Sequence, residues 1–448
     1  MATNPATPVD PSPTPAGVCA GQQVIIRMPS GNYKPVKATP GAKIDLGKFG
    51  SFLADDIIGR PFGHTYEIYT KGRARPLRVE SEYATVKETE ATNREIMDDP
   101  QAQRLTHDEI QRLKESSLAG EVDHDALIAK MAENNASFEK KTEFSKAKYI
   151  KRKKSKYSKV FTVVDPTLHN LWHFFFTRNS TKIRDIRIDT LAQLLAMLNV
   201  NAYSRLLVVD DTHGMVLSAV LSRLGANPQG QVLALHEGDS ANFDLLKLMP
   251  LSATVSERLL YLSWSRINPD APVQFDDKDT TEMSELDRRG HERRKATFLR
   301  VQAAQTALWQ GAWDGLVIAS QYQPESILRE LVPYIGGSRP IVVYSPSKEP
   351  LVTTAAFMKT NPDYLFPQIT ESWMREYQVL PGRTHPLMTM NAGGGYLLSA
   401  TRVYDSPEEV PIFSTPRLAT IKPNKTGRLP AKRLKAAQSA DINGSSIS

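Results

Sequence analysis

The feature that most constrains this chain is an alternation of short apolar runs with helix-like segments between residues 185 and 345. Leu191, Leu194, Leu195 and Leu198 repeat with helical spacing, and residues 215–224 form a largely apolar helix. Five runs of four residues indicate buried strands: 206–209, 232–235, 259–262, 316–319 and 341–344. Buried strands that alternate with helices are typical of a parallel sheet covered on both faces. The sequence therefore predicts a doubly wound, Rossmann-like α/β domain.

We place this domain at residues 161–413. Within it, residues 267–297 are strongly charged and are interpreted as an exposed insertion that leads into a helix ending near Trp309. A further helix is expected around residues 242–249. Near the end, three glycines at 393–395 precede the apolar run 396–400, which predicts a closing antiparallel hairpin.

A smaller domain precedes the α/β domain. β-prone runs at 24–26, 44–46, 66–68 and 77–79 alternate with Gly, Pro and Asn turns, and this pattern predicts a small β-barrel at residues 21–90. Residues 1–20 contain five prolines and no apolar period, so we expect a disordered arm there. Residues 91–160 are expected to form a helical connector, because Thr106 and Glu109 have the spacing of a capping box and Asp123 can open another helix.

The net charge of +7 is distributed very unevenly along the chain. Residues 140–159 carry ten Lys/Arg against one Glu, a net charge of +9, and the predicted disordered tail at 414–448 carries seven against one, a net charge of +6. Residues 1–139 and 160–413 each have a net charge of −4. A basic cluster of this density is the footprint of a polyanion binder. Nucleic acid is the favoured ligand, and an anionic membrane surface is the alternative.

The basic element at 135–159 is expected to be mostly helical, and its cations are the candidate RNA-binding residues. They are Lys140, Lys141, Lys146, Lys148, Lys151, Arg152, Lys153, Lys154, Lys156 and Lys159. Phe138, Phe144, Tyr149 and Tyr157 are interleaved with them, and aromatic rings can either anchor the helix or stack on bases. The competing interpretation is a solvated basic helix whose aromatics pack on a neighbouring domain.

A doubly wound sheet binds its ligand at the carboxyl ends of the strands. The loop after the first strand retains a single glycine, Gly214, and we expect His213 and Met215 to intrude on the space that a cofactor needs. Glu237, after the second strand, is placed to accept from ribose hydroxyls, but because the loop after the first strand is eroded we favour its interpretation as a solvent-facing acid of a turn. We therefore expect no cofactor-binding residue in this chain, only the degenerate remnants Asp210, Gly214 and Glu237.

Other chemistry is largely excluded. His169 and His173 have i, i+4 spacing but no acidic or cysteine neighbours, so we interpret them as packing residues rather than zinc ligands. The single cysteine, Cys19, excludes an internal disulfide. No nucleophile elbow, phosphate loop or paired-carboxylate motif is present, so no catalytic residue is predicted. No run approaches the roughly 18 apolar residues of a membrane span, and the first residues lack a signal-peptide pattern, so we expect neither secretion nor a membrane-spanning segment.

Four segments together resemble one family. They are IGRPFGHTYEI at 58–68, FEKKTEFS at 138–145 with KYIKRK at 148–153, RIDTLAQ at 187–193, and the run at 393–399. They are similar to the non-catalytic subunit of the eukaryotic tRNA (adenine-58-N1)-methyltransferase, a family also named as a translation initiation factor subunit. The resemblance covers about residues 20–405, and its second segment is the most specific.

The resemblance implies an N-terminal barrel, a methyltransferase-like domain, and assembly of two such chains with two copies of a catalytic paralogue that binds S-adenosylmethionine. It also implies tRNA as a partner and no cofactor in this chain. The paralogue carries an acidic residue at the end of the fourth strand, where this chain has Ser320-Gln321-Tyr322-Gln323-Pro324. Asp314 lies before that strand and cannot substitute for it.

Three functions are therefore weighed. The favoured one is a non-catalytic, tRNA-binding subunit of the methyltransferase. The alternatives are an active methyltransferase with an unusual cofactor loop, relying on Glu237 and Asp210, and an RNA-binding translation-factor scaffold. Short basic clusters at 422–425 and 431–435 suit nuclear-import receptors or RNA. The resemblance also points to the nucleus, so we expect nuclear localisation.

Overall fold

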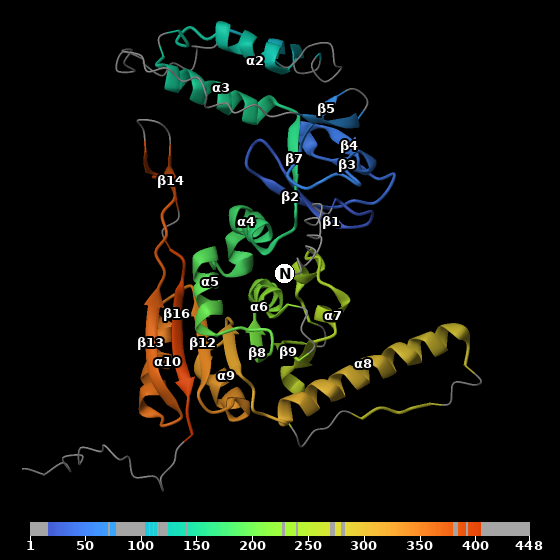
Figure 1. Cartoon of the computed structure of the whole chain (residues 1–448), viewed down its shortest axis with the longest axis vertical. Coiled ribbons are helices and arrows are strands. Elements are labelled where there is room, and N and C mark those ends of the chain that lie inside the picture. The colour runs from blue at the N-terminus through green and yellow to red at the C-terminus, as the bar shows by residue number, and fades with distance from the viewer. Residues whose placement is uncertain are drawn as a thin grey trace, which may run out of the picture. The chain divides into compact units, whose positions relative to one another are not determined.

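The computed structural model describes residues 17–69, 72–77, 104–106, 108–110, 112–113, 116, 124–139, 141–225, 229–238, 241–268, 274–278, 283–379, 384–390 and 393–404 (Figure 1). The elements below lie in one compact unit that ends at Val403. The predicted tail at 414–448 and most of the predicted arm at 1–20 lie outside the described residues.

A seven-stranded mixed sheet forms the centre of the larger domain. Its order is β10-β9-β8-β11-β12-β16-β13, and all neighbours from β10 to β12 are parallel. The parallel strands are β8 (Arg205–Asp210), β9 (Gln231–His236), β10 (Leu259–Ser263), β11 (Gly315–Ala319) and β12 (Arg339–Ser345). The last strand, β16 (Tyr396–Arg402), runs antiparallel between β12 and β13 (Tyr364–Glu371). All five predicted parallel strands and the antiparallel end are confirmed.

Alternate residues of these strands pack against two separate helical layers, because successive side chains of a strand point to opposite faces. Leu206 and Val208 of β8 face a core with helices α4, α5 and α6, whereas Leu207 and Val209 face a core with α8, α9 and α10 (Figure 1). The bounds of these helices are α4 (Leu168–Asn179), α5 (Ile188–Met197), α6 (Met215–Leu224), α8 (Glu285–Trp309), α9 (Pro324–Leu331) and α10 (Glu349–Thr360). The domain is doubly wound, as predicted.

The N-terminal domain is an antiparallel five-stranded sheet of order β2-β1-β7-β5-β6, with β3 and β4 paired separately. Its strands are β1 (Gln23–Arg27), β2 (Tyr33–Lys37), β3 (Lys43–Asp45), β4 (Ser51–Leu53), β5 (Thr65–Tyr69), β6 (Arg73–Leu77) and β7 (Val160–Val164). In the part of the chain that the structure describes, β2 and β6 form the sheet edges, so the predicted closed barrel is not confirmed.

The central position of β7 was not predicted. It pairs with both β1 and β5, so the predicted start of the second domain at residue 161 falls inside a strand of the first. The pattern in residues 21–90 could not reveal this strand, because β7 begins at Val160, far along the chain from the end of β6 at Leu77.

Helices α2 (His124–Glu133) and α3 (Glu143–Tyr157) lie before β7 in the chain. The capping box is confirmed, since the Thr106 amide donates to Glu109 Oε2 (2.8 Å) and the Glu109 amide donates to Thr106 Oγ1 (3.3 Å). Helix α8 begins at Glu285, inside the predicted charged insertion, and ends at Trp309, as expected. The helix expected at 242–249 is a single 3₁₀ turn, Asp244–Lys247, and the short helix α7 (Ala253–Ser256) follows it.

Between β13 and β16 a small hairpin, β14 (Tyr377–Gln378) and β15 (His385–Pro386), was not predicted. Among the described helices, none combines the length and apolar character needed to span a membrane.

Candidate functional site

Helix α3 carries the densest positive charge, and its ends are capped locally. The Thr142 hydroxyl accepts from the Ser145 amide (3.3 Å), which satisfies one free N–H of the first turn. Glu143 lies in the first turn, and Lys154 and Lys156 lie in the last. This order suits the helix dipole, which favours anions at the N-terminus and cations at the C-terminus.

Four of the predicted RNA-binding cations lie on one solvent-facing side of α3. Lys148, Lys151, Arg152 and Lys156 are all exposed, and they recur at i, i+3, i+4 and i+8. This spacing places them on one helical face over about 12 Å of axis, at 1.5 Å per residue. We call these four residues the α3 stripe.

The side of α3 next to the α3 stripe is an anchoring face. The Tyr149 hydroxyl donates to the carbonyl of Met131 in α2 (3.3 Å), and its ring packs edge-on against Phe138 with centroids 5.4 Å apart. The Lys153 ammonium lies 5.1 Å from the Tyr149 ring and 5.8 Å from the Tyr157 ring, and burial lowers the pKa of Lys153. Of the two roles considered for the aromatics, Phe138 and Tyr149 therefore serve as anchors.

The other predicted cations are less available. Lys141 and Lys154 are half-buried, and Lys146 lies 3.5 Å from Glu139 and 3.3 Å from Glu143, whose hydrogen bond raises the pKa of Lys146.

Lys159 is only 7% exposed, and burial lowers its pKa despite the nearby Glu67. A side chain so deeply buried does not fit a contact with phosphate at the surface. Lys159 directly precedes β7, which begins at Val160. Lys140 lies outside the described residues, as does the side chain of Phe144.

The loop after β8, where a cofactor would approach the sheet, is closed by its own hydrogen bonds. The buried Asp210 carboxylate accepts from the backbone amides of Thr212 (2.6 Å) and Leu217 (2.7 Å), and also from the Thr212 hydroxyl. Burial raises the pKa of Asp210, and these hydrogen bonds act against the rise. Asp210 thus fixes the start of α6, which is a structural role.

A segment of the same chain covers Gly214. A Cβ placed on Gly214 would lie 3.0 Å from Phe243 Cβ and 3.3 Å from Phe243 Cα. The Phe243 ring is 6% exposed and stacks on Tyr261, and the Leu245 amide donates to the His213 carbonyl (3.2 Å). A phosphate or adenosyl ligand has to lie close to the backbone of this glycine. In this chain Phe243 occupies the space beside the Gly214 backbone.

The expected intrusion of Met215 is wrong, because Met215 is fully buried in the core between α6 and the sheet. The obstruction comes instead from Phe243, which sequence reasoning missed. The buried aromatic character of that segment was the available signal, since Phe243 follows the second strand within a run that also contains Leu245 and Leu246.

The end of β11 is also occupied by contacts within the chain. The Ser320 hydroxyl and the Gln321 amide both donate to Asp211 Oδ2, at 2.6 and 2.9 Å. The Tyr322 hydroxyl bonds to the Glu237 carboxylate, and this bond raises the pKa of Tyr322. Glu237 is exposed, which favours its interpretation as an acidic residue of a solvent-facing turn over a role in binding ribose.

The residues present therefore do not fit an adenosyl cofactor. Each of the three remnants has another contact within the chain. Asp210 holds the start of α6, Gly214 lies against Phe243, and Glu237 bonds to Tyr322. Asp314 accepts from the Arg205 amide (2.9 Å) and pairs with Arg339 (3.0 Å), at the opposite end of β11 from Ser320.

Of the two histidines, His173 packs against an aromatic ring, whereas His169 is exposed. The His173 ring contacts Tyr33 with centroids 4.3 Å apart, and burial lowers the pKa of His173. The Trp172 indole donates to the Ile186 carbonyl (2.9 Å). Across the described ranges, no group of three His, Cys, Asp or Glu side chains is close enough to hold a metal ion.

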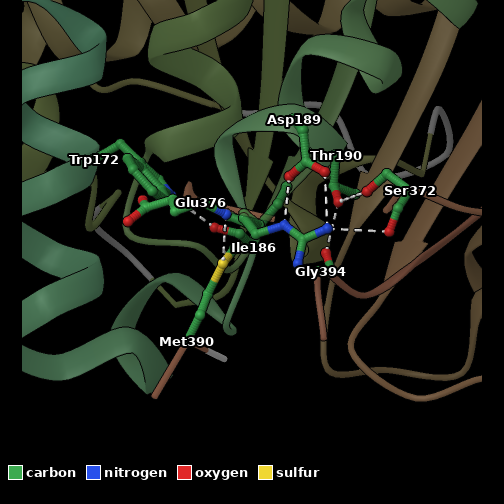
Figure 2. A network of polar contacts seen from close by, with 9 residues as sticks. Trp172, Ile186, Asp189, Thr190, Ser372, Glu376, Met390 and Gly394 are labelled. Carbon is green, nitrogen blue, oxygen red and sulfur yellow. Dashed lines mark hydrogen bonds and ion pairs between the residues drawn. The ribbon is translucent and has the colours of Figure 1, made fainter. Parts of the chain in front are cut away.

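Two of the segments noted in the sequence meet in one buried network (Figure 2). Arg187, 1% exposed, donates to both carboxylate oxygens of Asp189 (2.6 and 2.8 Å) and to the Ser372 carbonyl (3.1 Å). The Thr190 hydroxyl contacts the Ser372 hydroxyl (2.5 Å) and donates to the Gly394 carbonyl (2.7 Å). The network fastens the start of α5 to the segments that leave β13 and enter β16.

Gly394 has to be a glycine at this point. A Cβ there would lie 2.8 Å from Thr190 Oγ1 and 3.0 Å from the Arg187 guanidinium carbon. Burial opposes ionisation of Asp189, but the hydrogen bonds and charge of Arg187 outweigh it and lower the pKa of Asp189. The sequence singled out both segments but could not show that they touch.

The chain matches known proteins over most of its length. A family model described as the Gcd10p family matches residues 17–294. A Debaryomyces hansenii protein named tRNA (adenine(58)-N(1))-methyltransferase non-catalytic subunit TRM6 is 30% identical over 413 residues, which cover 86% of this chain and 87% of that protein. A Mus musculus protein of the same name is 29% identical over 474 residues, which cover 91% of this chain and 93% of that protein.

Among solved structures, the chain is similar to the tRNA (m1A58) methyltransferase TrmI from Aquifex aeolicus. The two chains are 12% identical with a TM-score of 0.43, and the match covers 87% of this chain and 100% of that chain. Because the family model spans more than half of the sequence, and the Debaryomyces relative is aligned over more than four fifths of both chains, this chain belongs to the Gcd10p family.

Proposed function

We propose that this chain is the non-catalytic, tRNA-binding subunit of a tRNA (adenine-58-N1)-methyltransferase. The observation that carries the proposal is a contrast within the chain. Phe243, Asp211 and Tyr322 fill or bridge the strand ends where a methyl donor would bind, whereas the α3 stripe presents four exposed cations. Relatives in the same family are named as non-catalytic subunits of this enzyme.

The electrostatics explain what the stripe contributes. Each phosphate that a Lys or Arg neutralises releases condensed counterions, and this term supplies affinity without reading sequence. A catalytic chain that binds S-adenosylmethionine then performs the transfer. Holding the tRNA against that chain makes the reaction effectively unimolecular, which is the gain that proximity provides.

The assembly we propose contains two copies of this chain and two of the catalytic paralogue. The active-methyltransferase alternative is opposed by the bonds that engage both Asp210 and Glu237. Within the described residues, no specific contact favours the translation-factor scaffold over the methyltransferase subunit.

Purified alone, this chain should transfer no methyl group from S-adenosylmethionine to tRNA. Mixing it with the catalytic chain should restore N1-methyladenosine, because each chain supplies only part of the site. Radiolabelled methyl incorporation into tRNA measures both cases. Turnover by this chain alone would reject the proposal, and so would full activity of the catalytic chain alone.

We also propose that the protein resides in the nucleus, on the basis of the basic clusters at 422–425 and 431–435. A chain truncated after Thr415 should then lose its nuclear accumulation in fluorescence microscopy. Unchanged localisation of the truncated chain would remove this role of the tail.

A further inference from the structure

Helix α8 has two halves with different surroundings. Its second half is built into the core through Ala304, Ala307 and Leu308, and the Trp309 indole donates to the Ile267 carbonyl (3.0 Å). Its first half extends away from the sheet, as Figure 1 shows. Helix α8 is therefore a rigid support whose first half has most of its residues exposed.

One side of this first half is covered by residues 274–278. His291 is 3% exposed, its ring lies against Phe275, and its Nε2 is 3.0 Å from Asp277 Oδ1. Asp277 Oδ2 also accepts from the Lys295 ammonium (2.5 Å), and the Phe298 ring stacks on Phe275. The carboxylate of Asp277 therefore lies on the His291 side of the helix.

The other side of α8 is basic. Arg289, Arg293 and Arg300 are exposed and recur at i, i+4 and i+11. At 3.6 residues per turn they lie within about 40° of one another and about 140–180° from His291 and Phe298, along about 16 Å of axis. The exposed Ala296 is the small residue between the second and third arginine. We call these three arginines the α8 arginine stripe.

We propose that the α8 arginine stripe is a second contact for the RNA backbone, separate from α3. This inference rests on the proposed function. Guanidinium groups bind phosphate in a bidentate manner, and a rigid helix holds them in register. Arg289 already pairs with Glu285, but both side chains are about two thirds exposed, and an ion pair so exposed to water is weak. A phosphate can replace that partner.

Phosphate suits this surface better than an acidic protein does. The centre of a protein interface is apolar and aromatic, with charge depleted. In the exposed part of α8 the aromatic residue is Phe298, which lies on the side away from the α8 arginine stripe. Its exposed large apolar residues are Leu286, which precedes the stripe, and Leu299, which lies about 80–120° around the helix from it. A row of cations without an apolar centre is what backbone contacts to nucleic acid require.

The test is a triple variant, R289Q/R293Q/R300Q, assembled with the catalytic chain. The slope of log affinity for tRNA against log salt should fall by about 2, since each contact contributes roughly 0.7–0.9. The affinity at physiological salt should fall by about tenfold. The matched control is K247Q/K348Q/K359Q, which removes the same charge from exposed lysines away from α8 and should leave the slope unchanged.

An unchanged slope in the α8 variant overturns the inference. So does loss of assembly with the catalytic chain at unaltered tRNA affinity, which would identify a protein contact instead. A variant that neutralises the α3 stripe distinguishes failure of this inference from failure of the proposed tRNA-binding function. An effect of the α3 variant without an effect of the α8 variant rejects only this inference, whereas no effect of either variant rejects tRNA binding by this chain.

Discussion

Replacing Lys148, Lys151, Arg152 and Lys156 by glutamine should weaken tRNA binding by the assembled complex by about tenfold to a hundredfold at physiological salt. The four side chains are exposed on one face of α3, and their loss removes four positive charges from one strip of about 12 Å. The slope of log affinity against log salt should fall by about 3 if all four contact phosphate. Filter binding or fluorescence anisotropy across a salt series measures both quantities.

Folding should survive this change, because the anchoring face of α3 is untouched. Tyr149 keeps its bond to the Met131 carbonyl and its contact with Phe138. The conservative control replaces Lys148, Lys151 and Lys156 by arginine, which retains the charge and should retain the slope. An unchanged slope in the glutamine variant would favour the interpretation of α3 as a solvated helix without RNA contact.

Replacing Arg187 by methionine should lower the free energy of unfolding by about 3–5 kcal/mol, the usual cost of removing one partner of a buried ion pair. The substitution leaves the Asp189 carboxylate without its guanidinium and the Ser372 carbonyl without its donor. At about 2–4 °C per kcal/mol, the melting temperature should fall by roughly 10 °C. Thermal and urea unfolding of the purified chain measure the loss.

Gly394→Ala tests the same network from its other side. The added methyl group meets Thr190 and Arg187 at 3.0 Å or less, so we expect a loss of about 1–3 kcal/mol from overpacking. Gly290→Ala is the matched control. It lies inside α8, where an added Cβ has only the Arg294 guanidinium nearby, at 3.6 Å, and alanine should stabilise a helix interior by up to about 1 kcal/mol. Equal effects at both glycines would contradict the role assigned to the network.

Acidity should affect the network in one direction. The pKa of Asp189 is lowered in the folded protein, so its contribution to stability is present above the unfolded value of about 4 and is lost as the pH falls through the folded value. The difference in stability between wild type and Arg187→Met should therefore shrink in acid. Urea unfolding of both proteins across an acidic pH series measures this difference.

The parallel strands were predictable because each is a continuous apolar run. β8 and β11 are buried on both faces, so nearly all of their residues are apolar. Such a run can be recognised without knowing which face of the sheet each residue occupies. The existence of an exposed basic surface was predictable from charge density alone. Which side of α3 faces solvent was not predictable, because that depends on α2, where the contact of Tyr149 with Met131 is made.

Long-range contacts account for what the sequence did not reveal. β7 completes a sheet whose other strands all precede residue 78, so local patterns could not place it. Thr190 and Gly394 are 204 residues apart in the sequence. Their hydrogen bond depends on the position of β16 in the sheet, between β12 and β13. The covering of Gly214 by Phe243 depends likewise on how the segment after β9 returns over the loop after β8.

The central claim, that this chain supplies a surface and not chemistry, is tested most directly by methyl transfer in a complex whose remnant groups are removed. Glu237 and Ser320 are replaced by alanine in this chain, the variant is assembled with the wild-type catalytic chain, and the rate of N1-methyladenosine formation is measured at saturating tRNA. We expect a rate within a few-fold of wild type, because the Glu237 carboxylate bonds Tyr322 and the Ser320 hydroxyl bonds Asp211 and the Tyr322 amide, all groups of this chain. A loss of turnover of about a hundredfold or more, with assembly and tRNA affinity intact, would show a working site in this chain and contradict the claim.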